Sequence, residues 1–378
     1  MKIVTIIGAR PQIIKAAALS RAIKEHYNDS IQEVIVHTGQ HYDENMSQVF
    51  FDELGIPKPD YNLHVGSASH GVQTAQMIEG IEKILVEERP DCIVLYGDTN
   101  STLAGAVAAS KIHIPVVHIE AGLRSFNKSM PEEINRIVCD HCSTLLFSPT
   151  LAGFNNLVKE GFKVDNEGPF TIDNPKVVHC GDIMYDNSLH FSSIADQKVD
   201  LLQRLGLEGT PYVLATLHRD SNTDHPERLN AILDALADLS KEIAIVLPMH
   251  PRTKKMVHQL VKQDKLDRLL HNENIKITEP VSFLEMIQLE KHAQLVITDS
   301  GGVQKESYFF KKPCVILRPE TEWVEIVKTG AALLADADHD NILAASRRYL
   351  QQPPVDFPEL FGDGHAASFM LKTMLETI

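Results

Sequence analysis

Short apolar runs alternate with helical patterns along almost the whole chain, and this alternation constrains the fold more than any other feature. Strands that are separated by helices form parallel sheets, so the pattern is typical of an α/β protein. The runs that we interpret as strands are 2–7, 33–37, 91–96, 115–119, 144–147, 212–217, 243–247, 275–277, 295–298 and 313–317.

The series of strands is interrupted once, at residues 163–176, which are rich in Gly, Pro and Asn and predict a linker or a crossing loop. We interpret 144–147 as the last strand before it. A length of 378 residues fits two domains. The sequence therefore predicts two doubly wound, Rossmann-like domains, at 1–175 and 176–364, with the active site in the cleft between them.

The formal net charge is −15, from 36 Lys and Arg against 51 Asp and Glu. Because nucleic-acid binding needs a basic face, this balance argues against a nucleic-acid partner, and we expect none. The apolar run at 1–7 is too short for a signal peptide or a membrane span, so we expect a cytoplasmic protein that binds no membrane. Cys139 and Cys142 have a metal-like spacing, but no second pair follows them, so we expect no metal.

Unusual polar residues follow the ends of the predicted strands. Ligands of doubly wound sheets bind beyond the carboxyl ends of the strands, so these side chains are expected to gather at the site. The residues are Arg10, Gln40, Asp98, Glu120, His218, His250, Ser300 and Arg318.

The stretch from Leu295 to Glu306 predicts a strand, a tight turn with two glycines and the start of a helix. Free N–H groups and the positive dipole end at a helix N-terminus favour a phosphate. Gly301 and Gly302 let a ligand approach the backbone closely. Glu306 lies one turn further on, where a carboxylate can accept hydrogen bonds from ribose hydroxyls. An ordinary strand–helix turn is the alternative, because the dinucleotide-binding fingerprint is missing.

Three acidic positions in the first half suggest acid/base chemistry. Glu120 ends an apolar strand, where a carboxylate is costly unless it has a partner or a task. Asp98 has an alternative role as the N-cap of the next helix. Glu132 has an alternative explanation in the helix dipole and an ion pair with Arg136, four residues later.

Cations are expected to neutralise an anionic ligand. Arg10 lies in the first strand–helix turn, and Lys15 follows on the helix, where a solvated charge is the alternative interpretation. In the second half, His218, Arg252 and Arg318 are placed to neutralise a diphosphate.

Together these stretches resemble the non-hydrolysing UDP-N-acetylglucosamine 2-epimerases over nearly the whole chain. The motifs that carry the resemblance are Gly8-Ala9-Arg10-Pro11 with Lys15, Gly97-Asp98-Thr99, His118-Ile119-Glu120-Ala121-Gly122-Leu123-Arg124, Pro131-Glu132-Glu133-Ile134-Asn135-Arg136, His218-Arg219, His250-Pro251, and Asp299-Ser300-Gly301-Gly302 with Gln304 and Glu306.

The resemblance implies a glycosyltransferase-B type of fold, with a C-terminal helix near 365–378 that crosses back onto the first domain. It implies interconversion of UDP-GlcNAc and UDP-ManNAc by elimination and re-addition of UDP, without a metal or a nicotinamide cofactor, in a homodimer. It assigns proton transfer to Asp98, Glu120 and Glu132, and a catalytic role to His218. The UDP contacts that it implies are Arg10, Ser300, Gly301, Gly302, Glu306 and Arg318, with Phe283 near the uracil. Lys15, His250 and Arg252 complete the set of substrate-binding candidates.

Some positions depart from the plain UDP-GlcNAc enzymes, which carry an Arg-Pro pair where this chain has Trp323. The positions that resemble the branch acting on UDP-2,3-diacetamido-2,3-dideoxyglucuronic acid are Ala9, Gln12, 42–46 and 321–323. That uronic acid is therefore the alternative substrate.

Regulation gives a second departure. Many bacterial members bind an activating UDP-GlcNAc through a Gln-His loop and an Arg-Gln pair. This chain has Gln40-His41 but Val72-Gln73, so we expect no such activation. The alternative is that Arg21 or another nearby cation replaces the missing arginine. A hydrolysing epimerase, a glycosyltransferase of the same fold and a catalytically silent UDP-sugar-binding protein are the other function classes that remain open.

Overall fold

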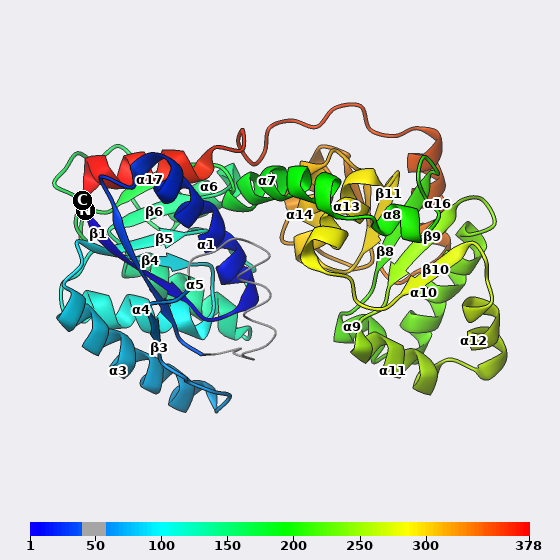
Figure 1. Cartoon of the computed structure of the whole chain (residues 1–378), viewed down its shortest axis with the longest axis horizontal. Coiled ribbons are helices and arrows are strands. Elements are labelled where there is room, and N and C mark those ends of the chain that lie inside the picture. Colours follow the sequence, from blue (N-terminus) through cyan, green and yellow to red (C-terminus); the bar gives the residue numbers. More distant parts are fainter. Residues whose placement is uncertain (40–57) are drawn as a thin grey trace. The chain divides into compact units, whose positions relative to one another are not determined.

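The computed structural model describes residues 1–39 and 58–378, which form two compact units (Figure 1). The first unit contains Met1–Asn187 and Glu359–Ile378, and the second contains Ser188–Pro358. Each unit has one parallel sheet with helices packed against it, so the predicted α/β class with two Rossmann-like domains is confirmed. Within the described ranges, no helix has both the length and the apolar character that crossing a membrane requires.

The first sheet reverses its strand order between β1 and β4, so the next strands along the chain lie on opposite sides of β1. Such a switch point is where ligands of doubly wound sheets bind. The seven described strands, in spatial order, are β3 (Tyr61–Asn62), β2 (Gln32–His37), β1 (Lys2–Ile7), β4 (Cys92–Tyr96), β5 (Val116–Ile119), β6 (Leu145–Ser148) and β7 (Lys176–His179).

Strand β7 corrects one prediction, that 144–147 is the last strand of the first half. Val177 and Val178 of β7 pair in parallel with β6, so the chain returns to the first sheet after 163–176. That stretch is therefore a crossing loop within the first unit. The chain passes to the second unit after Asn187, rather than at the proposed boundary after residue 175.

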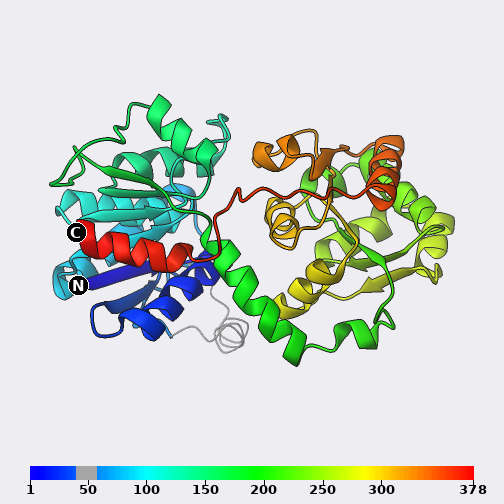
Figure 2. The same cartoon turned by 90° about the horizontal axis from the view of Figure 1, so that it is seen from above.

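The helices of the first unit cover both faces of its sheet, with α1 and α17 on one face and α3 and α4 on the other (Figure 1). Their bounds are α1 (Arg10–Ala22), the π-helix η1 (Ile23–Tyr27), α3 (His70–Glu88), α4 (Asn100–Lys111), α5 (Pro131–His141), α6 (Leu151–Lys159), the start of α7 (Ile183–Lys198) and α17 (Ala366–Thr377). Because α17 packs against α1, the chain termini lie side by side (Figures 1 and 2).

Helix α17 is held at its N-terminus by Asp186 of α7, whose two carboxylate oxygens accept hydrogen bonds from Ala366 N at 3.1 Å and Ala367 N at 2.8 Å. Burial raises the pKa of Asp186 to about 6, against the pull of these two N–H groups. Protonation of this carboxyl is therefore easier in the folded state than in the unfolded chain.

Replacement of Asp186 by Asn is expected to remove a pH dependence of stability. Because the folded pKa lies above that of an unfolded Asp, near 3.9, protonation of Asp186 stabilises the fold fully below pH 4. That contribution, roughly 3 kcal/mol for a shift of about two units, is lost as the pH rises through 6. We expect urea unfolding between pH 4 and 7 to show this loss in the wild type and in the exposed control Asp173→Asn, but not in Asp186→Asn. A parallel pH dependence in all three proteins would contradict the assignment.

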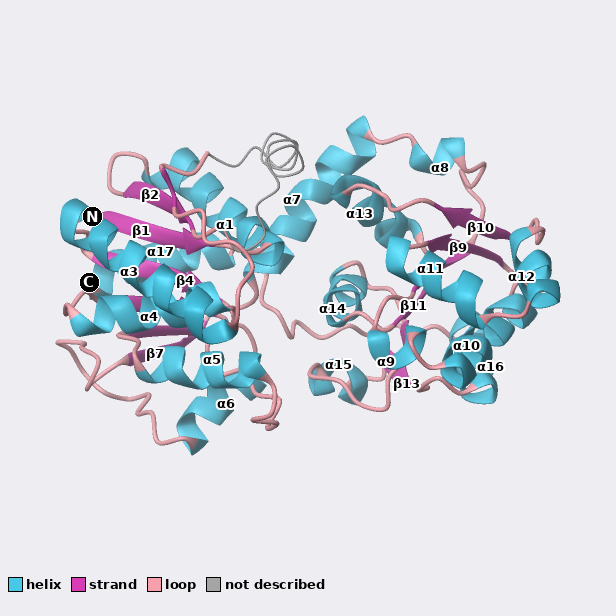
Figure 3. Cartoon of the chain, turned by 90° about the horizontal axis from the view of Figure 1, so that it is seen from below, coloured by secondary structure: helices cyan, strands magenta, loops and turns pink. Residues whose placement is uncertain are grey.

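The second sheet repeats the same topology, with its switch point between β8 and β11. Its strands, in spatial order, are β10 (Ile275–Thr278), β9 (Ala244–Pro248), β8 (Tyr212–Thr216), β11 (Leu295–Thr298), β12 (Cys314–Ile316) and β13 (Ala332–Leu334). Its helices are the rest of α7, α8 (Leu201–Arg204), α9 (Asp220–Thr223), α10 (Pro226–Leu239), α11 (Pro251–Leu260), α12 (Gln263–Leu270), α13 (Phe283–His292), α14 (Gly301–Phe309), α15 (Val324–Lys328) and α16 (His339–Gln351). Helices α10 and α16 lie side by side (Figure 3).

Alternation along each strand builds two cores in the second unit. Val213 and Ala215 of β8 point into one buried cluster with α10 and α16, while Tyr212 and Leu214 point into another with α8 and α13. Both faces are apolar because a parallel sheet is covered by helices on both sides. The strand ends then present polar turns at fixed positions.

Candidate active site

Glu120 follows β5 in a left-handed backbone conformation, with φ of 76°, that non-glycine residues rarely adopt. The N–H groups of Glu120 and Ala121 both donate to the Phe147 carbonyl, at 3.1 and 3.0 Å. The Glu120 carboxylate forms an ion pair with Lys15 of α1, and the two side chains are only 9% and 13% exposed. The strand-end carboxylate thus has a partner, and the solvated alternative for Lys15 is wrong.

Gln12 fixes the start of α1 against the end of β4. Its buried side chain accepts a hydrogen bond from Ala9 N at 3.1 Å and donates to the Tyr96 carbonyl at 3.0 Å. This places Arg10, the exposed first residue of α1, at the β1 side of the switch point. The turns after β1, β4 and β5 therefore meet within the first unit, while a position of Arg10 beside the other candidates stays a prediction.

Asp98 is not the N-cap of the helix that follows it. Thr99 is the N-cap, since its hydroxyl accepts a hydrogen bond from Thr102 N. The Asp98 carboxylate instead pairs with Arg136 of α5 at 2.7 Å. Although burial acts against its charge, Asp98 and Glu133 raise the pKa of Arg136.

The ion pair considered between Glu132 and Arg136 is also wrong, because Arg136 pairs with Glu133 at 2.7 Å in addition to Asp98. Glu133 is buried and accepts hydrogen bonds from Ser125 N and Phe126 N, both at 2.9 Å. Despite burial, these donors and Arg136 lower the pKa of Glu133. Glu132, in contrast, is exposed in the first turn of α5.

The stretch with metal-like spacing serves an ion-pair network. Asp140 is fully buried and pairs with His118 at 2.7 Å and with Arg124 at 2.7 Å. Within the described ranges, no group of three or more His, Cys, Asp or Glu side chains is arranged to hold a metal ion.

In the second unit, Asp299 organises the turn that carries His218. Its fully buried carboxylate accepts hydrogen bonds from His218 N at 3.1 Å and Arg219 N at 3.0 Å. It also lies 3.4 Å from Nδ1 of the His218 ring, which is 44% exposed. Burial lowers the pKa of His218 against the pull of Asp299, and this favours the neutral imidazole. The local sequence predicts only that Asp299 belongs to a tight turn, and its place in the motif of the resemblance is the one signal for a site residue.

Helix α14 begins at the switch point of the second sheet. Ser300 is its N-cap and accepts a hydrogen bond from Val303 N. A Cβ on Gly301 would overlap the Glu322 carboxylate, whereas a Cβ on Gly302 would meet only the Ser300 hydroxyl at 3.8 Å among the described residues. Gly302 therefore leaves the first turn of the helix open to a ligand.

Arg318 follows β12 and lies in a segment that is fastened to α14. Its guanidinium pairs with Glu322 at 2.9 Å. The Trp323 indole N–H donates to the Gly301 carbonyl at 2.9 Å, and the Thr321 hydroxyl donates to the Gln304 side chain at 2.5 Å. The cation is thus held near the first turn of α14.

The remaining candidates of the second unit differ in how they are held. Glu306 lies on α14 beside the fully buried Glu290, and burial together with Glu306 raises the pKa of Glu290. Phe283 begins α13 and packs edge-on against Phe191 at 5.3 Å. His250 caps α11, because its Nδ1 accepts a hydrogen bond from Arg252 N at 3.3 Å. The Arg252 guanidinium is already paired with Asp224 at 2.5 Å.

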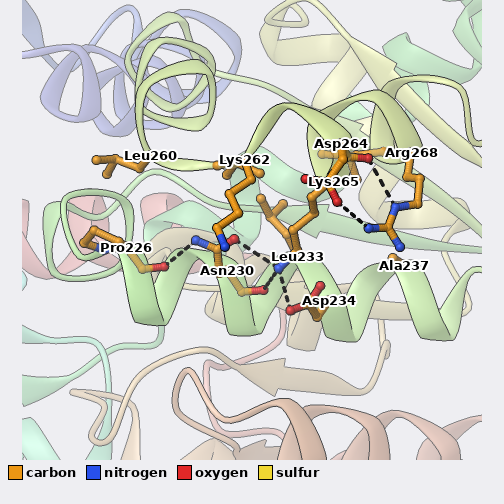
Figure 4. A pocket seen from close by; sticks show the side chains of 12 residues that line it. Pro226, Asn230, Leu233, Asp234, Ala237, Leu260, Lys262, Asp264, Lys265 and Arg268 are labelled. Carbon is orange, nitrogen blue, oxygen red and sulfur yellow. Dashed lines mark hydrogen bonds and ion pairs between the residues drawn. The ribbon is translucent and has the colours of Figure 1, made fainter.

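A surface pocket of about 560 Å³ lies along α10 and α12, but none of the predicted site residues lines it (Figure 4). Two of the three cations that line it are paired with carboxylates, Lys265 with Asp234 at 2.5 Å and Arg268 with Asp264 at 2.8 Å. Of the residues considered for activation, Gln40 and His41 lie outside the described residues, as does 42–46. Val72 is exposed on α3, while Gln73 is buried.

Comparison with known proteins gives matches over the whole length. A family model described as UDP-N-acetylglucosamine 2-epimerase matches residues 22–375. A UDP-2,3-diacetamido-2,3-dideoxy-D-glucuronate 2-epimerase from Pseudomonas aeruginosa is 48% identical over 369 residues, which cover 97% of this chain and 98% of that protein.

Two solved structures also align with this chain over its full length. The Methanocaldococcus jannaschii UDP-GlcNAc 2-epimerase in complex with UDP-GlcNAc and UDP is 40% identical, with a TM-score of 0.83 and full coverage of both chains. The Neisseria meningitidis UDP-GlcNAc 2-epimerase bound to UDP-GlcNAc is 27% identical, with a TM-score of 0.83 and the same coverage. The predicted glycosyltransferase-B type of fold is confirmed by these matches.

Proposed function

This chain belongs to the UDP-N-acetylglucosamine 2-epimerase family and is an isomerase that acts on UDP-sugars, and we propose that it inverts C2 of UDP-N-acetylglucosamine to give UDP-N-acetylmannosamine. The single observation that carries the reaction type is the pair of carboxylates beyond β4 and β5, Asp98 and Glu120, each held by a cation. A C2 inversion needs acid/base groups of this kind.

The reaction that these groups support is elimination followed by re-addition. A carboxylate removes the C2 proton, the C1–O bond breaks with its electron pair leaving on UDP, and a C1=C2 double bond forms. UDP oxygen then adds back to C1 while a carboxylic acid returns a proton to the other face of C2. Asp98, Glu120 and Glu132 are our candidates for these transfers, and His218 assists as a neutral imidazole. The sugar returns with only C2 inverted, and no cofactor is consumed.

The departing diphosphate needs stabilisation at the moment when the C1–O bond breaks. We assign this to the open first turn of α14, with Ser300, Gly301 and Gly302, and to the cation Arg318. Arg10, Lys15, His250 and Arg252 are further candidates for polar contacts with the substrate. Glu306 would accept from the ribose hydroxyls, and Phe283 would contact the uracil.

A second substrate is favoured by one comparison. The relative from P. aeruginosa that is 48% identical is named for UDP-2,3-diacetamido-2,3-dideoxy-D-glucuronate, whereas the M. jannaschii relative named for UDP-GlcNAc is 40% identical. Thr321 and Trp323, which resemble the uronate branch, are both hydrogen-bonded to α14, the helix to which we assign the diphosphate.

Initial rates on both sugars test the reaction and the substrate together. Incubation in D₂O with NMR of the products is expected to show deuterium at C2 and a UDP-linked epimer. We expect turnover of UDP-GlcNAc, as proposed, and faster turnover of the diacetamido uronate. We expect no activation when a trace of UDP-GlcNAc is added, because Val72 offers no charge to a second diphosphate. Sigmoidal activation by UDP-GlcNAc without turnover of the uronate would contradict both expectations. Free sugar plus UDP would indicate a hydrolase, and turnover only with an acceptor a glycosyltransferase.

We also propose that the enzyme is a homodimer, as the family resemblance implies. Light scattering after size exclusion is expected to give twice the mass of one chain. A mass of a single chain at micromolar concentration would contradict this.

A further inference from the structure

The two turns that carry Asp98 and Glu120 both have unusual backbone conformations. Gly97, just before Asp98, has φ of 62°, and Gly122, just after Ala121, has φ of 80°. Between them Glu120 itself has φ of 76°. A glutamate does not adopt this conformation without support, so the surrounding structure must hold it.

The two turns are joined by a chain of buried hydrogen bonds. Nε2 of His118 lies 2.9 Å from the Gly97 carbonyl oxygen, and Nδ1 lies 2.7 Å from one oxygen of Asp140. The other oxygen of Asp140 accepts from Gly122 N at 3.1 Å. His118 and Asp140 are both 0% exposed. The connection therefore runs from one turn to the other without reaching solvent.

In this hydrogen-bond network each positive side chain is paired with a negative one. Both ring nitrogens of His118 face acceptors, so both must carry protons, and the ring is an imidazolium. Burial opposes that charge, but Cys139 and Asp140 raise the pKa of His118 well above its usual value. Burial likewise opposes the charge of Asp140, but His118 and Arg124 lower its pKa. Arg124 is in turn held by Glu160, at 2.8 and 2.7 Å. Fully hydrogen-bonded buried charges of this kind resist displacement.

The turns also lie against the reacting groups. A Cβ built on Gly97 would come within 3.1 Å of the Glu120 carboxylate and 3.3 Å of the Lys15 ammonium. A shift of the Gly97 turn would therefore press on the Glu120–Lys15 pair and move Asp98 at the same time. Because catalytic groups must stay close to their productive positions, small movements here affect the rate.

We propose that His118 and Asp140 are positioning residues of the epimerisation: by linking the Gly97 carbonyl to the Gly122 N–H, they hold Asp98 and Glu120 in one geometry. Both side chains are fully buried, so we assign them no contact with the substrate. The proposal rests on the proposed function, because it concerns the rate of that reaction.

The first variant is His118→Phe, which keeps a planar ring but removes both donors. The second is Asp140→Asn, which leaves a single acceptor oxygen for partners that now use two. The control is Ile81→Ala, which opens a cavity under α3 of the same unit and removes none of these hydrogen bonds. For each protein we would measure the melting temperature, the UDP Kd by calorimetry, and kcat and KM at a temperature well below every melting transition.

We expect kcat to fall roughly 10- to 100-fold in His118→Phe and less in Asp140→Asn, with the UDP Kd unchanged within about twofold. Ile81→Ala should keep the wild-type kcat even if its melting temperature falls as much as that of His118→Phe or Asp140→Asn. A kcat near wild type in Asp140→Asn and His118→Phe, or an equal loss in Ile81→Ala, would overturn the positioning role. No turnover of either UDP-sugar by the wild type would instead contradict the proposed function, and this proposal with it.

Discussion

Replacement of Glu120 by Gln is expected to lower kcat for epimerisation by roughly 10²- to 10⁴-fold, the usual contribution of a general acid or base. The amide has nearly the shape of the carboxylate but cannot take up or deliver the C2 proton. It also leaves Lys15 without its counter-charge. UDP should still bind, because the groups that we assign to the diphosphate lie on α14 and after β12. The measurements are initial rates by NMR and UDP binding by calorimetry.

Glu88→Gln is the matched control for that experiment. Glu88 also pairs with a lysine of the first unit, Lys2 at 2.6 Å, but we give it no role with the substrate. It should therefore leave kcat close to the wild-type value. If Glu120→Gln itself turned over within about threefold of the wild type, Glu120 would not be a proton-transfer group.

Replacement of Arg318 by Ala is expected to weaken UDP binding by about 10- to 150-fold, equivalent to roughly 1.5–3 kcal/mol for one charge-assisted contact. Arg318 is held near the first turn of α14 by Glu322, so its charge is pre-organised for a diphosphate. Loss of UDP stabilisation should also slow the bond-breaking step, since the leaving group would lose a cation.

Two further variants separate the charge of Arg318 from its surroundings. Glu322→Gln removes the partner but keeps the cation, so UDP affinity should stay the same or rise. Arg347→Ala removes an exposed arginine that pairs with Glu242 in the same unit, and it should leave the affinity unchanged. An unchanged UDP Kd in Arg318→Ala would exclude Arg318 from the site.

The strands of both sheets were largely predictable. Each of the ten predicted runs overlaps an observed strand, because strands that are buried on both faces are continuously apolar. The strands that were missed are β3, β7 and β13, of two, four and three residues, whose side chains are mostly only partly buried. Short strands at or near the edge of a sheet carry too few apolar residues to give a periodic signal.

The place of the candidate site was also predictable from local patterns. In each sheet, parallel strands bring their carboxyl ends to one edge, so polar residues directly after the strands had to share that edge. The helix start at Gly301 and its cap at Ser300 follow from turn chemistry alone. These features depend on residues that are close together in the chain.

The partners of the site residues were decided by the tertiary structure. The i,i+4 spacing predicts an ion pair between Arg136 and Glu132. In the structure Arg136 instead pairs with Asp98, 38 residues away, and with Glu133. Glu120 meets Lys15 across 105 residues, and Asp299 holds the His218 turn across 81. Asp140, which the sequence marked only by its metal-like surroundings, became an ion-pair partner of His118. Strand order determines which turns become neighbours, and a buried charge then pairs with whichever opposite charge that order brings within reach, because leaving it unpaired in the core is too costly.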